Sequence, residues 1–260
     1  MVKKSLCIAL LALTTLSSSA QKKEWFNNVK LSGYGMTQYQ YSDQKGNKSN
    51  SFNLRLFRLV LDGRILNDFY WKAQIQVNGN TSTLGSSPRL VDLFAEWQKY
   101  DYFKVKIGEF KRPFTFDNPL HPIDQGFMGV GQVISKLSGF SDRTGEHPSN
   151  GRDLGLQVQG DFLKNAAGRN LLHYQIGVFN GQGINTKDVD QRKDIIGGLW
   201  VMPVEGLRLG VFGWEGSSAR KGNWTDAAGV NHTGEVRSLP KHRYALSGEY
   251  KFNDWTLRSE

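Results

Sequence analysis

The chain has 260 residues, is 38% hydrophobic and 12% aromatic, and carries a formal net charge of +9. No internal stretch approaches the roughly 20 apolar residues of a membrane-spanning helix, which argues against a helical membrane protein. Membrane-spanning strands remain compatible with this composition, because their lipid-facing residues alternate with polar ones.

The first twenty residues have the pattern of a secretory signal peptide. Lys3 and Lys4 precede the short apolar run Leu6–Leu16, and small residues end the segment at Ala20. We predict a signal peptide over residues 1–20, cleaved after Ala20, and one domain over residues 21–260. The alternative is an uncleaved anchor. Cys7 lies inside this segment and is the only cysteine, so the exported chain would have no disulfide and no thiolate metal site.

An exported basic protein of this kind is suited to anions, such as phosphate or sulfate, or to acidic lipid headgroups. We predict no nucleic-acid partner. The alternative is that the basic residues are scattered over the surface without a common role.

Alternation of apolar and polar residues predicts strands along almost the whole chain. The clearest case is Phe69–Asn78, where Trp71, Ala73 and Ile75 alternate with polar neighbours. The remaining expected strands are Val29–Tyr41, Phe52–Ile65, Leu90–Tyr100, one that begins at Phe103, Arg152–Gly160, Leu171–Asn180, Lys193–Pro203, Leu207–Glu215 and Arg243–Phe252, and Trp255 begins an eleventh.

Short turns alternate with long loops between these strands. The longest loop, Phe114–Asn150, far exceeds the usual connection of about 4 to 6 residues, and a second long loop is expected over Gly216–Lys241. Outer-membrane barrels are built in this way, with short periplasmic turns and long extracellular loops. The predicted fold class is therefore all-β, a transmembrane antiparallel β-barrel in which the loop Phe114–Asn150 narrows a water-filled pore.

Several stretches resemble the phosphate-selective porin O and P family of outer-membrane channels. They follow one order through the chain: FNLRLFRLVLDGRI (Phe52–Ile65), LFAEWQ (Leu93–Gln98), VKIGEFKRPFT (Val105–Thr115), GRDLGLQVQG (Gly151–Gly160), YQIGVFNGQGIN (Tyr174–Asn185) and TLRSE (Thr256–Glu260).

This resemblance implies a sixteen-stranded barrel in the outer membrane of a Gram-negative bacterium, in contact with its lipids and commonly trimeric. About ten or eleven strands are present here, so the resemblance also implies that C-terminal strands are missing. The implied function is passive anion uptake, for some members of phosphate or polyphosphate. By the motif match, Arg55 and Arg58 correspond to the family's arginine-rich strand, and Lys111 with Pro113 to its strand-to-loop junction. Gly198 stands where a lumenal arginine would be sought.

Rings of Arg or Lys attract anions in such pores while leaving the ions free to exit. Arg55 breaks the alternation of its strand, so either it lies beyond the membrane zone or a bulge shifts it. The alternative for each basic residue is a simple ion pair with a carboxylate such as Asp62, Asp92, Glu96 or Glu109. The predicted pore-lining, anion-binding residues are Arg55, Arg58, Lys72, Lys104, Lys106, Lys111, Arg112, Arg143, Arg208 and Arg243.

Other functions have less support from the sequence. The five histidines show no metal-ligand spacing, and no nucleophile elbow or phosphate loop is present, so we expect no enzyme activity, metal or cofactor. His147 with Ser149 is read as loop polarity rather than as a catalytic pair. A general, non-selective porin and an exported β-sandwich that binds glycans, with Trp214 or Trp224 stacking on sugars, remain as alternatives. Trp71, Trp97, Tyr174, Tyr244 and Tyr250 lie on the apolar parity, as expected for interfacial aromatic residues.

Overall fold

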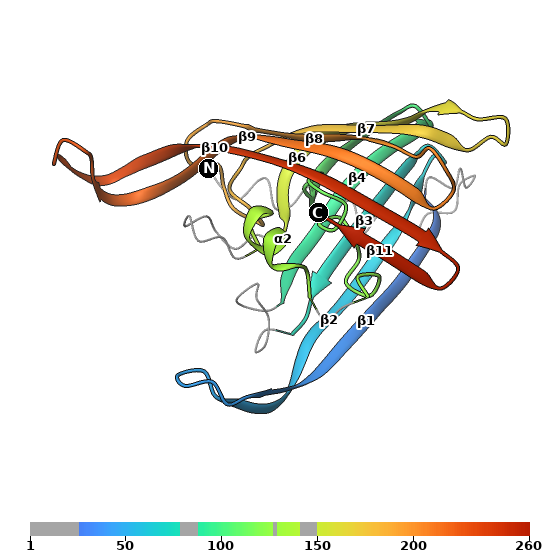
Figure 1. Cartoon of the computed structure of the whole chain (residues 1–260). Coiled ribbons are helices and arrows are strands. Elements are labelled where there is room, and N and C mark those ends of the chain that lie inside the picture. Colours follow the sequence, from blue (N-terminus) through green and yellow to red (C-terminus); the bar gives the residue numbers. More distant parts are fainter. Residues whose placement is uncertain (1–25, 79–87, 127–128, 141–149) are drawn as a thin grey trace, which may run out of the picture.

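A computed structural model describes residues 26–78, 88–126, 129–140 and 150–260. The expected signal peptide, residues 1–20, lies outside the described residues. The described chain forms one curved antiparallel sheet with its strands in chain order (Figure 1). The elements are β1 (Phe26–Ser42), β2 (Ser49–Ile65), β3 (Phe69–Gln76), β4 (Arg89–Tyr100), β5 (Phe103–Lys111), α2 (Gln132–Leu137), β6 (Arg152–Lys164), β7 (Asn170–Phe179), β8 (Asp194–Val201), β9 (Leu207–Thr225), β10 (Asn231–Phe252) and β11 (Trp255–Ser259).

The prediction of an all-β antiparallel fold is confirmed. All eleven strands belong to a single sheet, rather than to the two packed sheets of a sandwich. Each strand pairs with its neighbour in sequence, and among the described strands β1 and β11 do not pair with each other. The sheet therefore has the curvature of a barrel wall without closing into a complete barrel.

Among the described residues, no helix is long and apolar enough to cross a membrane.

The two faces of the sheet are reversed relative to a soluble protein. Aliphatic side chains on the convex face are exposed, including Ile107 at 57% and Val211 at 53%. Polar side chains on the concave face are buried, including Gln76 at 1% and Glu96 at 5%. Apolar residues normally occupy the interior of a soluble protein. Apolar-out and polar-in alternation is instead the pattern of a barrel that faces lipid outside and water inside.

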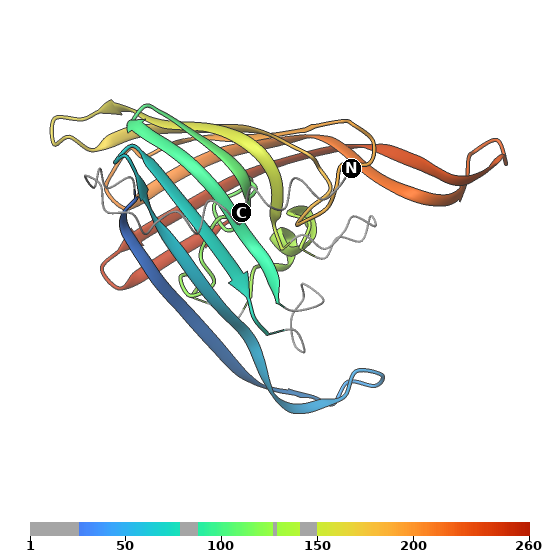
Figure 2. The same cartoon turned by 180° about the vertical axis from the view of Figure 1, so that it is seen from behind.

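Turn lengths alternate as the sequence predicts, with one correction. The segment Gly216–Lys241 was expected to be a long loop, but β9 and β10 continue through it as a paired hairpin that projects beyond the sheet (Figure 2). Pairing persists to Thr225 opposite Asn231. The connecting turn is short because the carboxylate of Asp226 accepts hydrogen bonds from the backbone N–H groups of Ala228 and Val230, both at 2.9 Å. A local turn of this kind lets strand pairing replace an irregular loop.

An aromatic cluster fixes the loop between β5 and β6 against the concave face. Phe114 and Phe116, from the loop, pack with Phe110, Phe179, Ile196, Phe212 and Trp214 of the strands. Phe116 meets Phe212 edge to face, with 5.3 Å between ring centroids. The loop and α2 therefore lie inside the curve of the sheet (Figure 1). This placement agrees with the prediction that the loop narrows the lumen.

Glycines make room for these rings. A Cβ atom added at Gly155 would lie 2.4 Å from Cδ1 of Phe179, and one added at Gly198 would lie 2.2 Å from Cδ1 of Phe212. Heavy atoms cannot approach so closely, so neither position can carry a side chain without moving an aromatic residue. This explains why position 198 has glycine rather than a lumenal arginine.

A row of aromatic rings borders the short-turn end of the sheet. Tyr100 and Tyr102 stack with 5.4 Å between ring centroids, and Phe162 stacks on Tyr174 at 5.2 Å. Trp97 meets Tyr100 edge to face at 5.6 Å. Trp97 and Tyr174 thus lie in a band of rings near the strand ends, the position in which barrels carry interfacial aromatic residues.

Candidate anion-binding site

A β-bulge in β2 brings two arginines to one cavity. The register opposite β1 passes from Met36 paired with Leu56 to Thr37 paired with Leu54, so Arg55 is the extra residue. Of the two interpretations of Arg55, the bulge is confirmed. Such a bulge re-aims side chains, and Arg55 and Arg58 line the same cavity although they lie three positions apart.

Neighbouring strands are also irregular at this end of the sheet. In β4 the register jumps from Gln74 opposite Asp92 to Ile75 opposite Leu90. In β5 the backbone of Gly108 has a φ of 131°, and a Cβ atom there would lie 2.2 Å from the carbonyl oxygen of Leu93. Only glycine tolerates this conformation. Beyond these irregular positions, side chains no longer alternate strictly between the two faces of the sheet. Charged residues that strict alternation would place on opposite faces therefore gather between the sheet and the loop.

The cavity has a volume of about 230 Å³ and lies between the strands and the loop. Four cationic side chains line it, Arg55 and Arg58 from β2, Lys111 from the end of β5, and Arg152 from the start of β6. The opposite side is formed by the loop and the region around α2. The complete lining is Arg55, Leu56, Arg58, Lys111, Pro122, Gln125, Gly129, Val130, Ser135, Phe140, Asn150 and Arg152.

Neutral groups satisfy most of the contacts that these cations make. Arg58 is 1% exposed and donates to Oε1 of Gln76 at 3.0 Å and to the hydroxyl of Tyr34 at 3.1 Å. Lys111 donates to the carbonyl oxygen of Leu120. Neutral partners orient a cation without cancelling its charge, so Arg58 keeps the local potential positive.

Arg152 shares a single carboxylate with a second cation. Its Nε atom lies 2.6 Å from Oδ1 of Asp92, and Nζ of Lys72 lies 3.2 Å from Oδ2 of the same carboxylate. Asp92 is 4% exposed. One buried carboxylate therefore balances two cations, and the cavity retains an excess of positive charge.

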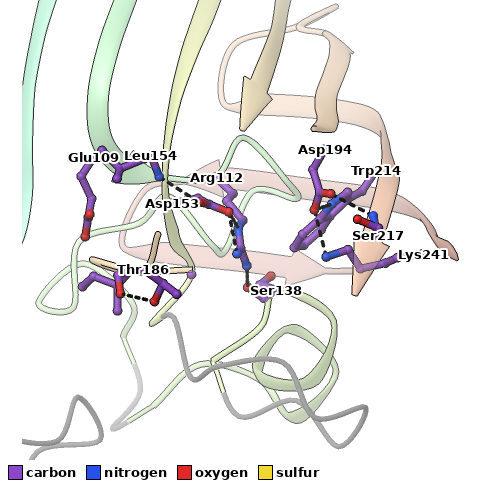
Figure 3. A network of polar contacts seen from close by, with 12 residues as sticks. Glu109, Arg112, Ser138, Asp153, Leu154, Thr186, Asp194, Trp214, Ser217 and Lys241 are labelled. Carbon is purple, nitrogen blue, oxygen red and sulfur yellow. Dashed lines mark hydrogen bonds and ion pairs between the residues drawn. The ribbon is translucent and has the colours of Figure 1, made fainter. Parts of the chain in front are cut away.

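Arg112 connects the loop to the sheet. It is 1% exposed, pairs with Oδ2 of Asp153 at 2.9 Å and donates to the carbonyl oxygen of Ser138 at 3.1 Å (Figure 3). Its guanidinium carbon lies 4.7 Å from the ring centroid of Trp214. Arg243 makes a similar link, because it donates to the carbonyl oxygen of Leu137 in α2 and lies 4.7 Å from the same ring. Both residues thus position the loop.

A buried carboxylate orients the Trp214 ring that these arginines contact. Asp194 accepts a hydrogen bond from Nε1 of Trp214 at 2.7 Å and from the backbone N–H of Ser217 at 2.9 Å, and it pairs with Nζ of Lys241 at 2.9 Å (Figure 3). A buried charge held by this many donors is strongly fixed. The loop therefore docks on a rigid part of the sheet.

The far edge of the loop is tied to β10 and β11. Arg258 lies 3.2 Å from Oδ1 of Asp117 and 3.0 Å from Oε2 of Glu249. The carboxylate of Glu260 accepts hydrogen bonds from the backbone N–H groups of Phe116 and Asp117, both at 2.7 Å. Contacts at both ends of the curved sheet thus hold the loop across its concave side.

The predicted cations nearer the short turns have carboxylate partners. Lys104 lies 3.7 Å from Asp161. Lys106 lies 3.7 Å from Glu96 and 5.2 Å from the ring centroid of Phe94. Arg208 lies 2.9 Å from Glu249 and 4.1 Å from the ring centroid of Phe116.

His121 lies in the loop beside the cavity. Its ring contacts that of Tyr34, with 4.5 Å between centroids. Burial lowers the pKa of His121 below its ordinary value, and the nearby cations Lys72, Lys111 and Arg58 lower it further. The neutral form of this imidazole is therefore favoured more than that of an ordinary histidine.

The predicted residues thus fall into distinct groups. Arg55, Arg58 and Lys111 meet at the cavity, and Lys72 adjoins it through Asp92. Arg143 lies outside the described residues. Arg152 was not predicted, because strict alternation along its strand would put it on the convex face together with Leu154. Its position after Gly151, where the long loop rejoins the sheet, was the available signal. The other predicted residues are Lys104, Lys106 and Arg208, which are paired with carboxylates, and Arg112 and Arg243, which position the loop.

Taken together, the apolar convex face, the polar concave face and the inward loop define a porin-like channel wall. The family model for phosphate-selective porin O and P matches residues 31–125. This match covers most of β1, all of β2 to β5 and the first part of the loop, and it confirms the resemblance to this family. No curated protein matches the chain.

Proposed function

We propose that this chain forms the wall of an outer-membrane porin in a Gram-negative bacterium, through which small anions such as phosphate diffuse passively. The observation that carries this proposal is the cavity between the loop and the sheet, lined by Arg55, Arg58, Lys111 and Arg152. Arg suits phosphate because its planar fork donates parallel hydrogen bonds, whereas Lys acts as a point charge. The family match supports both the channel and the phosphate preference.

The finer parts of the proposal rest partly on the resemblance and partly on the same site. A homotrimer and passage of polyphosphate are properties implied by the resemblance. The inward loop would restrict the pore so that ions pass close to the arginines. Contacts with neutral partners leave the charge of Arg58 uncancelled, which suits a pore that must attract an anion and then release it.

The test is electrical. We expect the full-length protein, in a planar bilayer that separates two KCl concentrations, to give a reversal potential shifted toward the equilibrium potential of chloride. Added phosphate should reduce the chloride current. The physical reason is that the arginine-rich constriction attracts chloride and binds phosphate more strongly.

A cation-side or near-zero reversal potential would contradict the anion preference and leave a general, non-selective porin. Extraction that needs no detergent would contradict the membrane location.

A further inference from the structure

We infer that the cavity binds organic anions, such as monoesters of phosphate with an apolar group, more strongly than inorganic phosphate. This inference rests on the proposed function, because it assigns a ligand class to the same site. The cavity presents cations on the sheet side and apolar side chains on the loop side, a combination that a bare inorganic ion would use only in part.

The cationic half comes from strand ends. Arg55 and Arg58 come from β2, and Lys111 and Arg152 from the two strands that the loop connects. Nη1 of Arg55 is buried and has no hydrogen-bond acceptor among the described residues. A buried guanidinium N–H without an acceptor is costly, so an anion that supplied one would be stabilised here.

The apolar half comes mainly from the loop. Pro122, Val130 and Phe140 line the cavity together with Leu56 of β2. The ring of Phe140 lies close to Gly151, where the loop rejoins the sheet, since a Cβ atom added at Gly151 would lie 2.8 Å from its ring carbon Cε2. Apolar surface in water gains free energy when another apolar group covers it. Inorganic phosphate, chloride and water cannot provide that cover.

The size of the cavity also favours a ligand larger than inorganic phosphate. Its volume of about 230 Å³ is several times the ~30 Å³ that one water molecule occupies in the liquid. Small-molecule sites typically combine apolar lining with a few placed polar groups, as this cavity does. The anionic group would lie against the arginines, and the apolar group would extend toward Phe140.

The experiment compares two blocking ions in the full-length channel. Chloride current in a planar bilayer is titrated with inorganic phosphate and with phenyl phosphate at one pH, and the ratio of their half-blocking concentrations is measured. We expect phenyl phosphate to block at a concentration about tenfold lower, because its ring is buried against the apolar half.

Two variants locate the effect. Phe140→Ala should bring the ratio close to one, because the phenyl ring of the ligand loses its main contact. Phe140→Leu should retain much of the preference for phenyl phosphate. Val133→Ala is the matched control. Val133 lies in α2, is 56% exposed and is not part of the cavity lining, so its replacement should leave the ratio unchanged.

The outcomes separate this inference from the proposed function. Block by both ions at equal concentrations would overturn the inference and leave the anion channel standing. A preference for phenyl phosphate that survives Phe140→Ala would overturn its assignment to this cavity. Block by neither ion would contradict the proposed function, and the inference would fail with it. If one Phe140 variant does not fold, the ratio in the unmodified protein still tests the preference, and the other Phe140 variant tests its assignment to this cavity.

Discussion

The concave face carries basic residues in two regions that differ in how their charge is balanced. At the loop end, Arg58 and Lys111 contact Gln76, Tyr34 and the Leu120 carbonyl, all of them neutral. Two further cations there, Arg152 and Lys72, share a single carboxylate, that of Asp92. At the turn end, the lysines and arginine have carboxylate partners, as in the pairs Lys104 with Asp161, Lys106 with Glu96 and Arg208 with Glu249.

This difference shows that counting basic residues does not locate a binding site. A cation beside a carboxylate contributes little to the potential a few ångströms away, because the two fields largely cancel. A cation held by neutral groups keeps its field. The structure therefore concentrates attraction for anions at the loop end, although both regions are rich in Lys and Arg.

The largest expected effect comes from removing charge at the loop end. Arg55→Gln with Arg58→Gln should lower the ratio of anion to cation permeability by about tenfold or more, because a unit charge a few ångströms from an ion is worth several kcal/mol at an effective dielectric constant of 20. Reversal potentials in a KCl gradient measure this ratio. The matched control is Arg220→Gln with Arg237→Gln, which removes the same charge from exposed positions on the β9–β10 hairpin.

An equal loss in both double variants would mean that net charge, rather than the cavity, sets the selectivity. Gel electrophoresis in detergent would verify that each variant is folded, because a folded variant runs as the folded band until the sample is heated.

A smaller effect is expected at the turn end. Lys104→Gln with Asp161→Asn removes a pair whose charges already cancel, so the permeability ratio should change by less than about twofold. His173 lies 2.8 Å from Asp161, and an asparagine at position 161 can still accept its hydrogen bond. The same reversal-potential measurement tests this pair. A change as large as that of the two cavity arginines would remove the distinction between the regions.

Much of the fold was predictable from the sequence, because alternation of apolar and polar residues follows directly from strand geometry. The hairpin of β9 and β10 was not, since residues such as Ser217, Arg220 and Lys221 show no apolar face that alternation could reveal. The cavity was predictable only in part. Alternation along β2 predicts that Arg58 faces the concave side. Arg55 reaches the cavity because of the bulge, and Arg152 because of the loop that precedes it. Irregular backbone and distant loop contacts leave no periodic signal.

The smallest effect concerns His121, which adjoins the loop-end cations. Its pKa is lowered first by burial and then by Lys72, Lys111 and Arg58. A histidine with a lowered pKa gains its charge at a lower pH than an ordinary histidine does. In KCl, the anion preference of the unmodified protein should therefore rise above that of His121→Gln with a midpoint at a lower pH than an ordinary histidine would give, as permeability ratios measured over a pH series would show. A midpoint at or above the ordinary pKa of histidine would show that burial and the loop-end cations do not disfavour the charged imidazole, and would weaken the case for an uncancelled positive field at the cavity.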